Sequence, residues 1–373
     1  SGARAADAVV IAEPEPMEYV RICDTYGAGF FYIPGTETCL KISGYFRYDI
    51  GVGNRGFMDV SDQKDGIDFI DSRNDTYAKS GRFAFRVDAR QETELGTLQG
   101  FAHINFNYGT NTDGYYPGQF GIPAEFVPPI TGYSEGIGIN YAFVRLGGFL
   151  VGKTDSVFTS FTGGGYVMDD DLIPYGPWEG PQVSYTFTGG NGFSAAISLE
   201  TGPGYDATVP FIFPGSTIDV TTIDSYMPHV AGGVGYTAGW GGVSASAGYD
   251  SIWEEWAIKG RVDFNATEAL KLYAMFGWKS NGDVGDIPYN VYGNWNGDWA
   301  LWTGASFNAT EKATINAQVT YTEAEDFYAA LNVSYELVNN FTITPQVYYT
   351  DNFDVSTDNN WGGKLRFEYA FGQ

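Results

Sequence analysis

Residues 82–90 read RFAFRVDAR, a stretch in which apolar and charged side chains alternate. Successive side chains of a β-strand point to opposite faces, so this period of two predicts a strand with one apolar face and one wetted face. The apolar parity holds Phe83, Phe85, Val87 and Ala89, and the opposite parity holds Arg82, Arg86, Asp88 and Arg90.

The same period recurs from Leu40 to the end of the chain, in segments of about ten residues bounded by Gly, Asn or Asp. The first segment carries Lys41, Ser43, Tyr45, Arg47 and Asp49 on its polar parity. The last carries Trp361, Leu365, Phe367, Tyr369 and Phe371 on its apolar parity, with Lys364, Arg366 and Glu368 opposite. A soluble β-sandwich would show the same alternation, so periodicity alone does not identify the fold.

The connections between segments distinguish the two folds, because short and long links alternate strictly. Short links lie near 91–95, 147–148, 189–192, 239–242, 265–268, 308–311 and 338–340. Long links are centred near 65, 122, 169, 214, 252, 287, 324 and 355. Seven short and eight long links join sixteen strands, and tight turns at one end with longer loops at the other are typical of a closed transmembrane barrel. The pattern predicts an all-β, sixteen-stranded antiparallel β-barrel whose lumen is too wide for side chains to fill.

Composition agrees with a β fold and excludes several classes of function. Aromatic residues make up 17% of the chain, there are 50 glycines, and no run approaches the roughly 18 apolar residues of a transmembrane helix. With 45 acidic against 20 basic residues, the formal charge of −25 argues against a nucleic-acid partner. Cys23 and Cys39 lack the spacing of a metal site, and we expect no cofactor. A structural disulfide in an oxidising compartment is favoured over two free thiols.

A family resemblance is carried by Tyr19–Asp49, YVRICDTYGAGFFYIPGTETCLKISGYFRYD. This block resembles the opening of the alphaproteobacterial general (diffusion) porins, and similar stretches recur at 185–200, 249–263 and 335–347. The resemblance implies a homotrimeric sixteen-stranded porin in the bacterial outer membrane, with both termini periplasmic and a third external loop folded inward. It also implies passive diffusion of small hydrophilic solutes and ions, and contact with outer-membrane lipid or lipopolysaccharide.

Mapped onto this chain, the resemblance predicts three parts. Residues 1–39 form a periplasmic lead-in that contains Cys23 and Cys39, and residues 40–371 form the barrel. Residues 156–182, between the fifth and sixth strands, form the constriction loop around VMDDDLIPYGPWEG at 167–180.

Selectivity in a wide pore follows from the charges at its narrowest point. The predicted loop offers the acidic residues Asp169, Asp170, Asp171 and Glu179. The wetted parity of the first three strands offers Lys41, Arg47, Arg82, Arg86, Arg90 and His103. Acids facing bases would set a transverse field, and we expect a weak to moderate preference for cations. In the alternative, the three aspartates form a solvated turn and the arginines pair with Asp49 and Asp88. Arg145, Lys153 and Asp155 are weaker candidates because their parity is ambiguous.

Two other classes of function stay open at this point. A substrate-specific, sugar-type channel would use the aromatic residues of the long links near 122 and 214. A barrel-embedded hydrolase would need His103 or His229 as its base, yet no serine-rich motif lies near His103 and His229 lies at a predicted loop edge. The sequence therefore favours a channel over an enzyme.

Overall fold

The computed structural model describes residues 21–53, 63–64, 75–111, 132–204, 206–208, 217–281, 289–352 and 360–372. Sixteen strands form the barrel: β2 (Cys39–Gly53), β5 (Ala78–Thr93), β6 (Gly96–Asn111), β7 (Gly132–Leu146), β8 (Phe149–Asp155), β9 (Glu179–Thr188), β10 (Phe193–Glu200), β13 (His229–Ala238), β14 (Gly241–Asp250), β15 (Glu255–Asn265), β16 (Leu270–Lys279), β17 (Trp299–Asn308), β18 (Ala313–Thr322), β19 (Asp326–Val338), β20 (Phe341–Asn352) and β21 (Asn360–Phe371). Each strand pairs antiparallel with its neighbours, and β21 pairs with β2 to close the barrel.

Smaller elements decorate this wall. Strand β1 (Phe31–Tyr32) pairs with β2 as an extra strand, and two short hairpins join β3 (Gln63–Lys64) to β4 (Asp75–Thr76) and β11 (Asp206–Thr208) to β12 (Thr217–Asp219). The helical elements are η1 (Asp24–Tyr26) and α1 (Val157–Ser160). No helix in the described part of the chain is long and apolar enough to cross a membrane.

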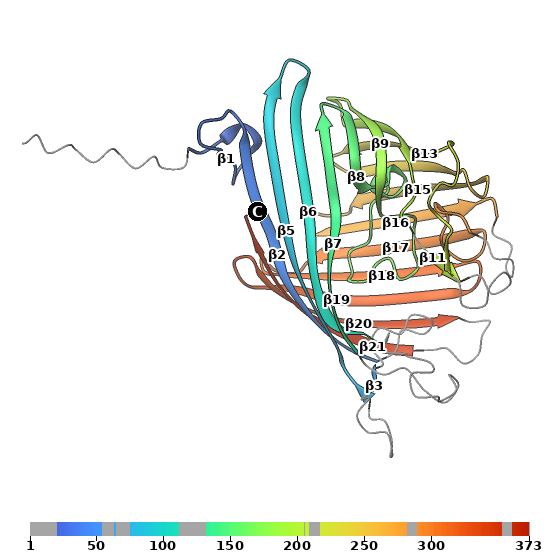
Figure 1. Cartoon of the computed structure of the whole chain (residues 1–373). Coiled ribbons are helices and arrows are strands. Elements are labelled where there is room, and N and C mark those ends of the chain that lie inside the picture. Colours follow the sequence, from blue (N-terminus) through green and yellow to red (C-terminus); the bar gives the residue numbers. More distant parts are fainter. Residues whose placement is uncertain are drawn as a thin grey trace, which may run out of the picture.

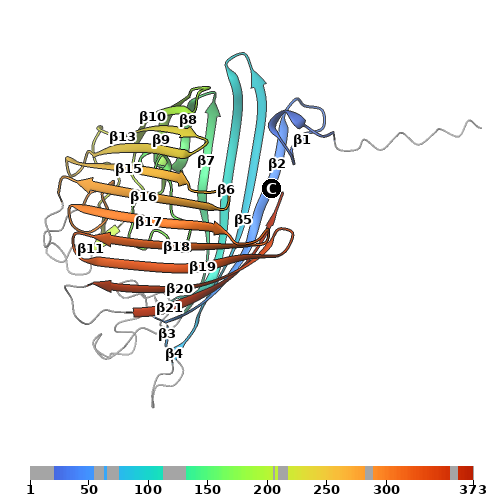
Figure 2. The ribbon, with the colours of Figure 1, turned by 180° about the vertical axis from the view of Figure 1, so that it is seen from behind.

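The predicted count of sixteen strands is confirmed. Seven turns of two to four residues join strands at one end, but the predicted links at the other end are not all long: four residues, 251–254, join β14 to β15, and three, 323–325, join β18 to β19. The strands are strongly tilted, as closure of a barrel requires. Strands β5, β6 and β7 therefore run steeply on one wall, while β16 to β19 run across them on the opposite wall (Figures 1 and 2).

The two faces of the wall differ as the alternation predicts. On β2, Phe46 is 51% exposed on the outside, whereas Tyr45 and Asp49 are each only 8% exposed. Outward Phe46 stacks on Phe83 of the neighbouring strand, with ring centroids 4.6 Å apart. An apolar outside and a polar inside are the arrangement of a barrel in lipid with a wetted lumen.

One irregularity changes the parity of a strand. His103 of β6 pairs with Tyr141 of β7, but the next residue, Ile104, pairs with Ile139, so Asn140 is an extra residue in a bulge. Odd-numbered residues of β7 face outward before the bulge and inward after it. Phe143 accordingly stacks on Phe101, with centroids 5.3 Å apart.

The described part of the lead-in forms a small cap, residues 21–38, at the turn end of the barrel. Its Cys23 forms the predicted disulfide with Cys39, the first residue of β2. Phe30 of the cap lies over Lys41 and Arg90, with the Arg90 guanidinium 5.2 Å from its ring. Residues 1–20 of the predicted lead-in lie outside the described residues.

Candidate pore constriction

The loop between β8 and β9 enters the lumen because β8 is short. This strand has seven residues and its pairing with β7 ends at Lys153 and Ala142, whereas β7 extends on to Gly132. The chain therefore leaves the wall at Ser156, before the end of the neighbouring strand. The Ser156 side chain accepts a hydrogen bond from Phe158 N and caps α1. The green segment that follows crosses the interior of the barrel in Figure 1. The loop occupies residues 156–178, and the last four residues of the predicted range, 179–182, already belong to β9.

The loop is fastened to the far wall mainly through its backbone carbonyls. Trp302 Nε1 donates to Ile173 O at 3.0 Å, and Gln346 Nε2 donates to Met168 O at 2.8 Å. Two cations of β15 act in the same way: Arg261 donates to Gly164 O at 2.6 Å, and Lys259 donates to Tyr175 O. Buried carbonyls need such partners, so these bonds fix the height and path of the loop.

A second loop supports the first from the open end. Asn294, between β16 and β17, accepts from Gly176 N at 2.9 Å and donates back to Gly176 O at 3.3 Å. Tyr292 and Trp295 of this second loop are buried in the same apolar cluster as Phe158 and Tyr175 of the first. The inward loop is therefore packed on two sides.

The predicted acidic residues have different surroundings. Asp169 accepts from Lys364 of β21 at 2.7 Å. Asp170 turns into the loop itself, where it accepts from Tyr175 Oη at 2.7 Å and from Gly165 N. Burial raises the pKa of the Asp170 carboxyl above its usual value, although the Tyr175 hydrogen bond opposes this. Asp171 accepts from Trp178 Nε1 at 2.9 Å.

Glu179 does not belong to the loop. It is the first residue of β9 and the register partner of Asp155, the last residue of β8. Asp155 in turn accepts from Tyr141 Oη at 3.0 Å. The acidic pair therefore stands where the chain leaves the wall and returns to it.

The predicted basic residues line the wall formed by β2, β5 and β6, but several are already paired. Arg47 donates to Glu368 at 2.9 Å, and Arg90 donates to Asp88 at 2.6 Å. The alternative reading of the arginines is thus correct for Arg90 and Asp88, whereas Asp49 pairs with Arg366 at 2.8 Å. Lys41 lies beneath the cap.

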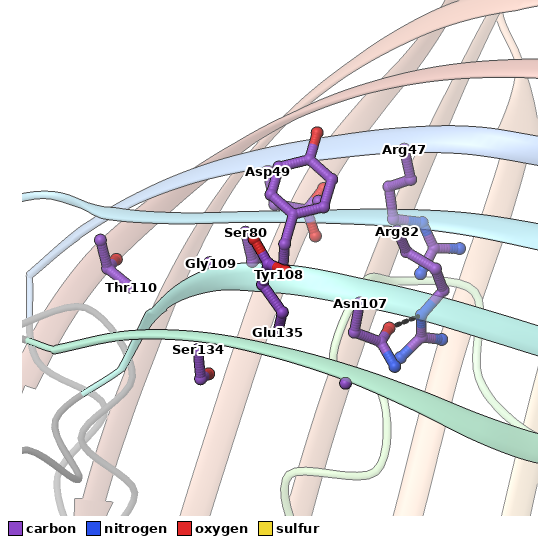
Figure 3. A pocket seen from close by; sticks show the side chains of 12 residues that line it. Arg47, Asp49, Ser80, Arg82, Asn107, Tyr108, Gly109, Thr110, Ser134 and Glu135 are labelled. Atoms are coloured by element: carbon purple, nitrogen blue, oxygen red, sulfur yellow. Dashed lines mark hydrogen bonds between the residues drawn. The ribbon is translucent and has the colours of Figure 1, made fainter.

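The remaining basic residues, Arg82, Arg86 and His103, form no ion pair among the described residues. Arg82 donates to the amide oxygen of Asn107 at 2.7 Å, and the Arg86 guanidinium lies 5.5 Å from the ring of Tyr45. His103 is only 3% exposed and packs edge-on against Tyr141. Figure 3 shows Arg47 and Arg82 side by side on adjacent strands, with the bond from Arg82 to Asn107.

Three further residues belong to this charged lumen. Lys364, Arg366 and Glu368 of the last strand pair with Asp169, Asp49 and Arg47. Their wetted parity was readable from the alternation in β21, and barrel closure brings them beside β2. The same alternation that selected Arg82 and Arg86 could therefore have selected them.

The hydrolase alternative finds no support at His229. This residue is fully buried, its Nε2 lies 2.8 Å from Thr221 O, and its Nδ1 accepts from Ser251 N at 3.0 Å. Both ring nitrogens therefore serve to fix loops. No group of three or more metal-ligating side chains is found in the described ranges.

A closed antiparallel barrel with an apolar outside, a charged lumen and a loop across that lumen defines a membrane channel of the outer-membrane type. Residues 7–369 match the sequence profile described as Porin subfamily, and the chain belongs to this family. It is an outer-membrane porin, integral to the bacterial outer membrane, that passes small solutes.

Similar proteins agree with this assignment. Porin Omp2a of Brucella canis is 43% identical over 381 residues, which cover 100% of this chain and 95% of the relative. Porin Omp2b of Brucella neotomae is 44% identical with the same coverage. Among solved structures, the outer membrane channel DcaP of Acinetobacter baumannii superposes with a TM-score of 0.62 at 16% identity, covering 91% of this chain and 99% of that one. A porin of Rhodopseudomonas blastica gives 0.51 at 12% identity, with 89% and 100% covered. These structural likenesses concern the fold alone.

Proposed function

We propose that this porin is a general diffusion pore with a weak to moderate preference for cations. The observation that carries the proposal is that charges of both signs stand without an ion-pair partner around the loop. Of the residues selected for the constriction, Asp169, Arg47 and Arg90 form ion pairs, whereas three acids and three bases have no ion-pair partner among the described residues: Asp170, Asp171, Glu179, Lys41, Arg82 and Arg86. This local balance makes the preference weak, and the net charge of −25 gives its sign.

The reversal potential in a KCl gradient across a planar bilayer tests this proposal. The double variant Asp171→Asn with Glu179→Gln is expected to shift the reversal potential toward anion preference. The double variant Arg82→Ala with Arg86→Ala is expected to shift it toward cation preference. The shifts should be largest at low salt, because the Debye length is ~10 Å at 0.1 M. Glu268→Gln with Glu311→Gln is the matched control, since it removes the same charge from two exposed turns. An equal shift in this control, or no shift in the first variant, would contradict the role of the constriction.

We further propose that three copies assemble through the outer face of β2, β5, β6 and β21. Phe83 stacks there on Phe46, Phe106 and Phe371, with centroids 4.6, 5.7 and 6.3 Å apart. Clustered aromatic side chains provide a large, rigid contact area. The rest of the apolar belt would then face outer-membrane lipid, including lipopolysaccharide. In the same bilayer experiment, closure in three equal steps is the expected behaviour.

A further inference from the structure

Two arginines stand directly opposite each other on the lumen wall. Arg47 of β2 and Arg82 of β5 are register partners. Like charges in this position destabilise a pair of strands. Arg47 is compensated by Glu368, whereas among the described residues Arg82 hydrogen-bonds only to the neutral amide of Asn107. Each guanidinium makes its hydrogen bond through Nε, so within the described part of the chain the two terminal nitrogens of each are available to a ligand.

A polar hollow of about 400 Å³ opens beside this pair (Figure 3). Its floor consists of small residues, among them Ser80, Gly109 and Gly136. Two carboxylates also line it: Asp49 is held by Arg366 through two hydrogen bonds of 2.8 Å, and Glu135 accepts from Tyr133 Oη at 3.1 Å. Among the described residues, Arg366 and Arg47 form ion pairs with Asp49 and Glu368, whereas the guanidinium of Arg82 forms none.

We propose that this hollow binds a small oxyanion, a carboxylate or phosphate group, between the guanidiniums of Arg47 and Arg82. A guanidinium presents its N–H groups as a planar fork that matches the oxygens of such a group, and an anion between two guanidiniums removes their mutual repulsion. Asn107 accepts from Arg82 through Oδ1, which leaves its amide N–H groups to donate. The volume exceeds that of one water molecule, about 30 Å³, many times over, so the anion can enter with part of its hydration shell. This inference goes beyond the proposed function, because it assigns an anion-binding site to a pore that prefers cations.

The test is the effect of inorganic phosphate on KCl conductance in a planar bilayer, at constant ionic strength. For the natural sequence we expect a reduction that saturates with phosphate concentration. Arg82→Gln should raise the half-effect concentration about tenfold, because a charge-assisted hydrogen bond is lost. Arg82→Lys should give an intermediate value, since it retains the charge but loses the fork. Lys312→Gln, which removes a positive charge from an exposed turn, should leave the half-effect concentration unchanged.

Ser80→Leu is a second variant, which fills the floor of the hollow and keeps both arginines. It should abolish saturation. Acetate in place of phosphate should also saturate if the site recognises oxyanions generally, and saturation by phosphate alone would narrow it to phosphate. A linear, non-saturating effect of both anions, or the same half-effect concentration for the natural sequence, Arg82→Gln and Ser80→Leu, would overturn the proposal. The proposed cation preference is tested by the reversal potential in KCl without phosphate. A failure of that proposal is therefore distinguished from a failure of the anion site.

Discussion

Lys364 of β21 donates to both carboxylate oxygens of Asp169 at 2.7 Å, although 195 positions separate the two residues. Their side chains are only 10% and 19% exposed. Asp169 has a φ of 55°, in the left-handed region that Asp and Asn tolerate better than most residues. The last strand therefore holds the inward loop at Asp169, whose left-handed backbone conformation an aspartate adopts with little strain.

Lys364→Met is expected to loosen the loop, because it removes the ammonium group that donates to both oxygens of the largely buried Asp169 carboxylate. A buried polar group that loses its partner costs about 1–3 kcal/mol, more when it is charged. Hydrogen exchange of residues 156–178, followed by mass spectrometry, measures the free energy of opening. Asp169→Asn in the Lys364→Met background should recover part of the loss, since Asn keeps the left-handed turn and removes the charge that Lys364 balances in the natural sequence. Strictly additive effects of the two changes would show that they do not act as a pair.

The sequence was sufficient to predict the barrel because each strand carries its own alternation. Residues 82–90 show which face is wetted without reference to any other part of the chain, and the links between strands can be counted. The prediction of inward residues stops at β7, where the extra residue Asn140 reverses the parity. For this reason the orientation of Arg145 could not be read from the pattern, although its guanidinium lies 5.3 Å from the ring of inward Phe143.

The partners of the site residues could not be predicted for a different reason. Arg47 meets Glu368 only because the first and last strands close the barrel, and Asp169 meets Lys364 only because the loop crosses the lumen. These contacts depend on tertiary geometry, whereas parity is a local property. The run Asp169, Asp170 and Asp171 looks uniform in sequence, yet the middle residue turns into the loop body and accepts from Tyr175.

The outward parity of the strands predicts where charge is not tolerated. Ile197 of β10 is 57% exposed on the outer face, and Ser194 of the same strand lines a polar hollow of about 390 Å³ on the inner face. Ile197→Arg should cost roughly 2–4 kcal/mol if this position lies near the bilayer midplane, and Ser194→Arg should cost far less. The fraction of heat-resistant barrel in unboiled gel samples reports the difference. Equal losses for both variants would mean that the assigned faces of β10 are wrong.

The pKa of Asp170 predicts how docking of the loop depends on pH. Burial raises this pKa in the folded protein above the value of an unfolded aspartate, about 3.9. The stabilisation linked to Asp170 is therefore complete below the unfolded pKa and is lost as the pH rises through the folded pKa. Opening of the loop, measured by hydrogen exchange and corrected for the intrinsic rate, should be less favourable at mildly acidic pH than at neutral pH. Asp170→Asn should flatten this dependence because its side chain does not titrate, whereas Glu311→Gln in an exposed turn should preserve it. Equal pH slopes for the natural sequence and Asp170→Asn would show that another group controls docking of the loop.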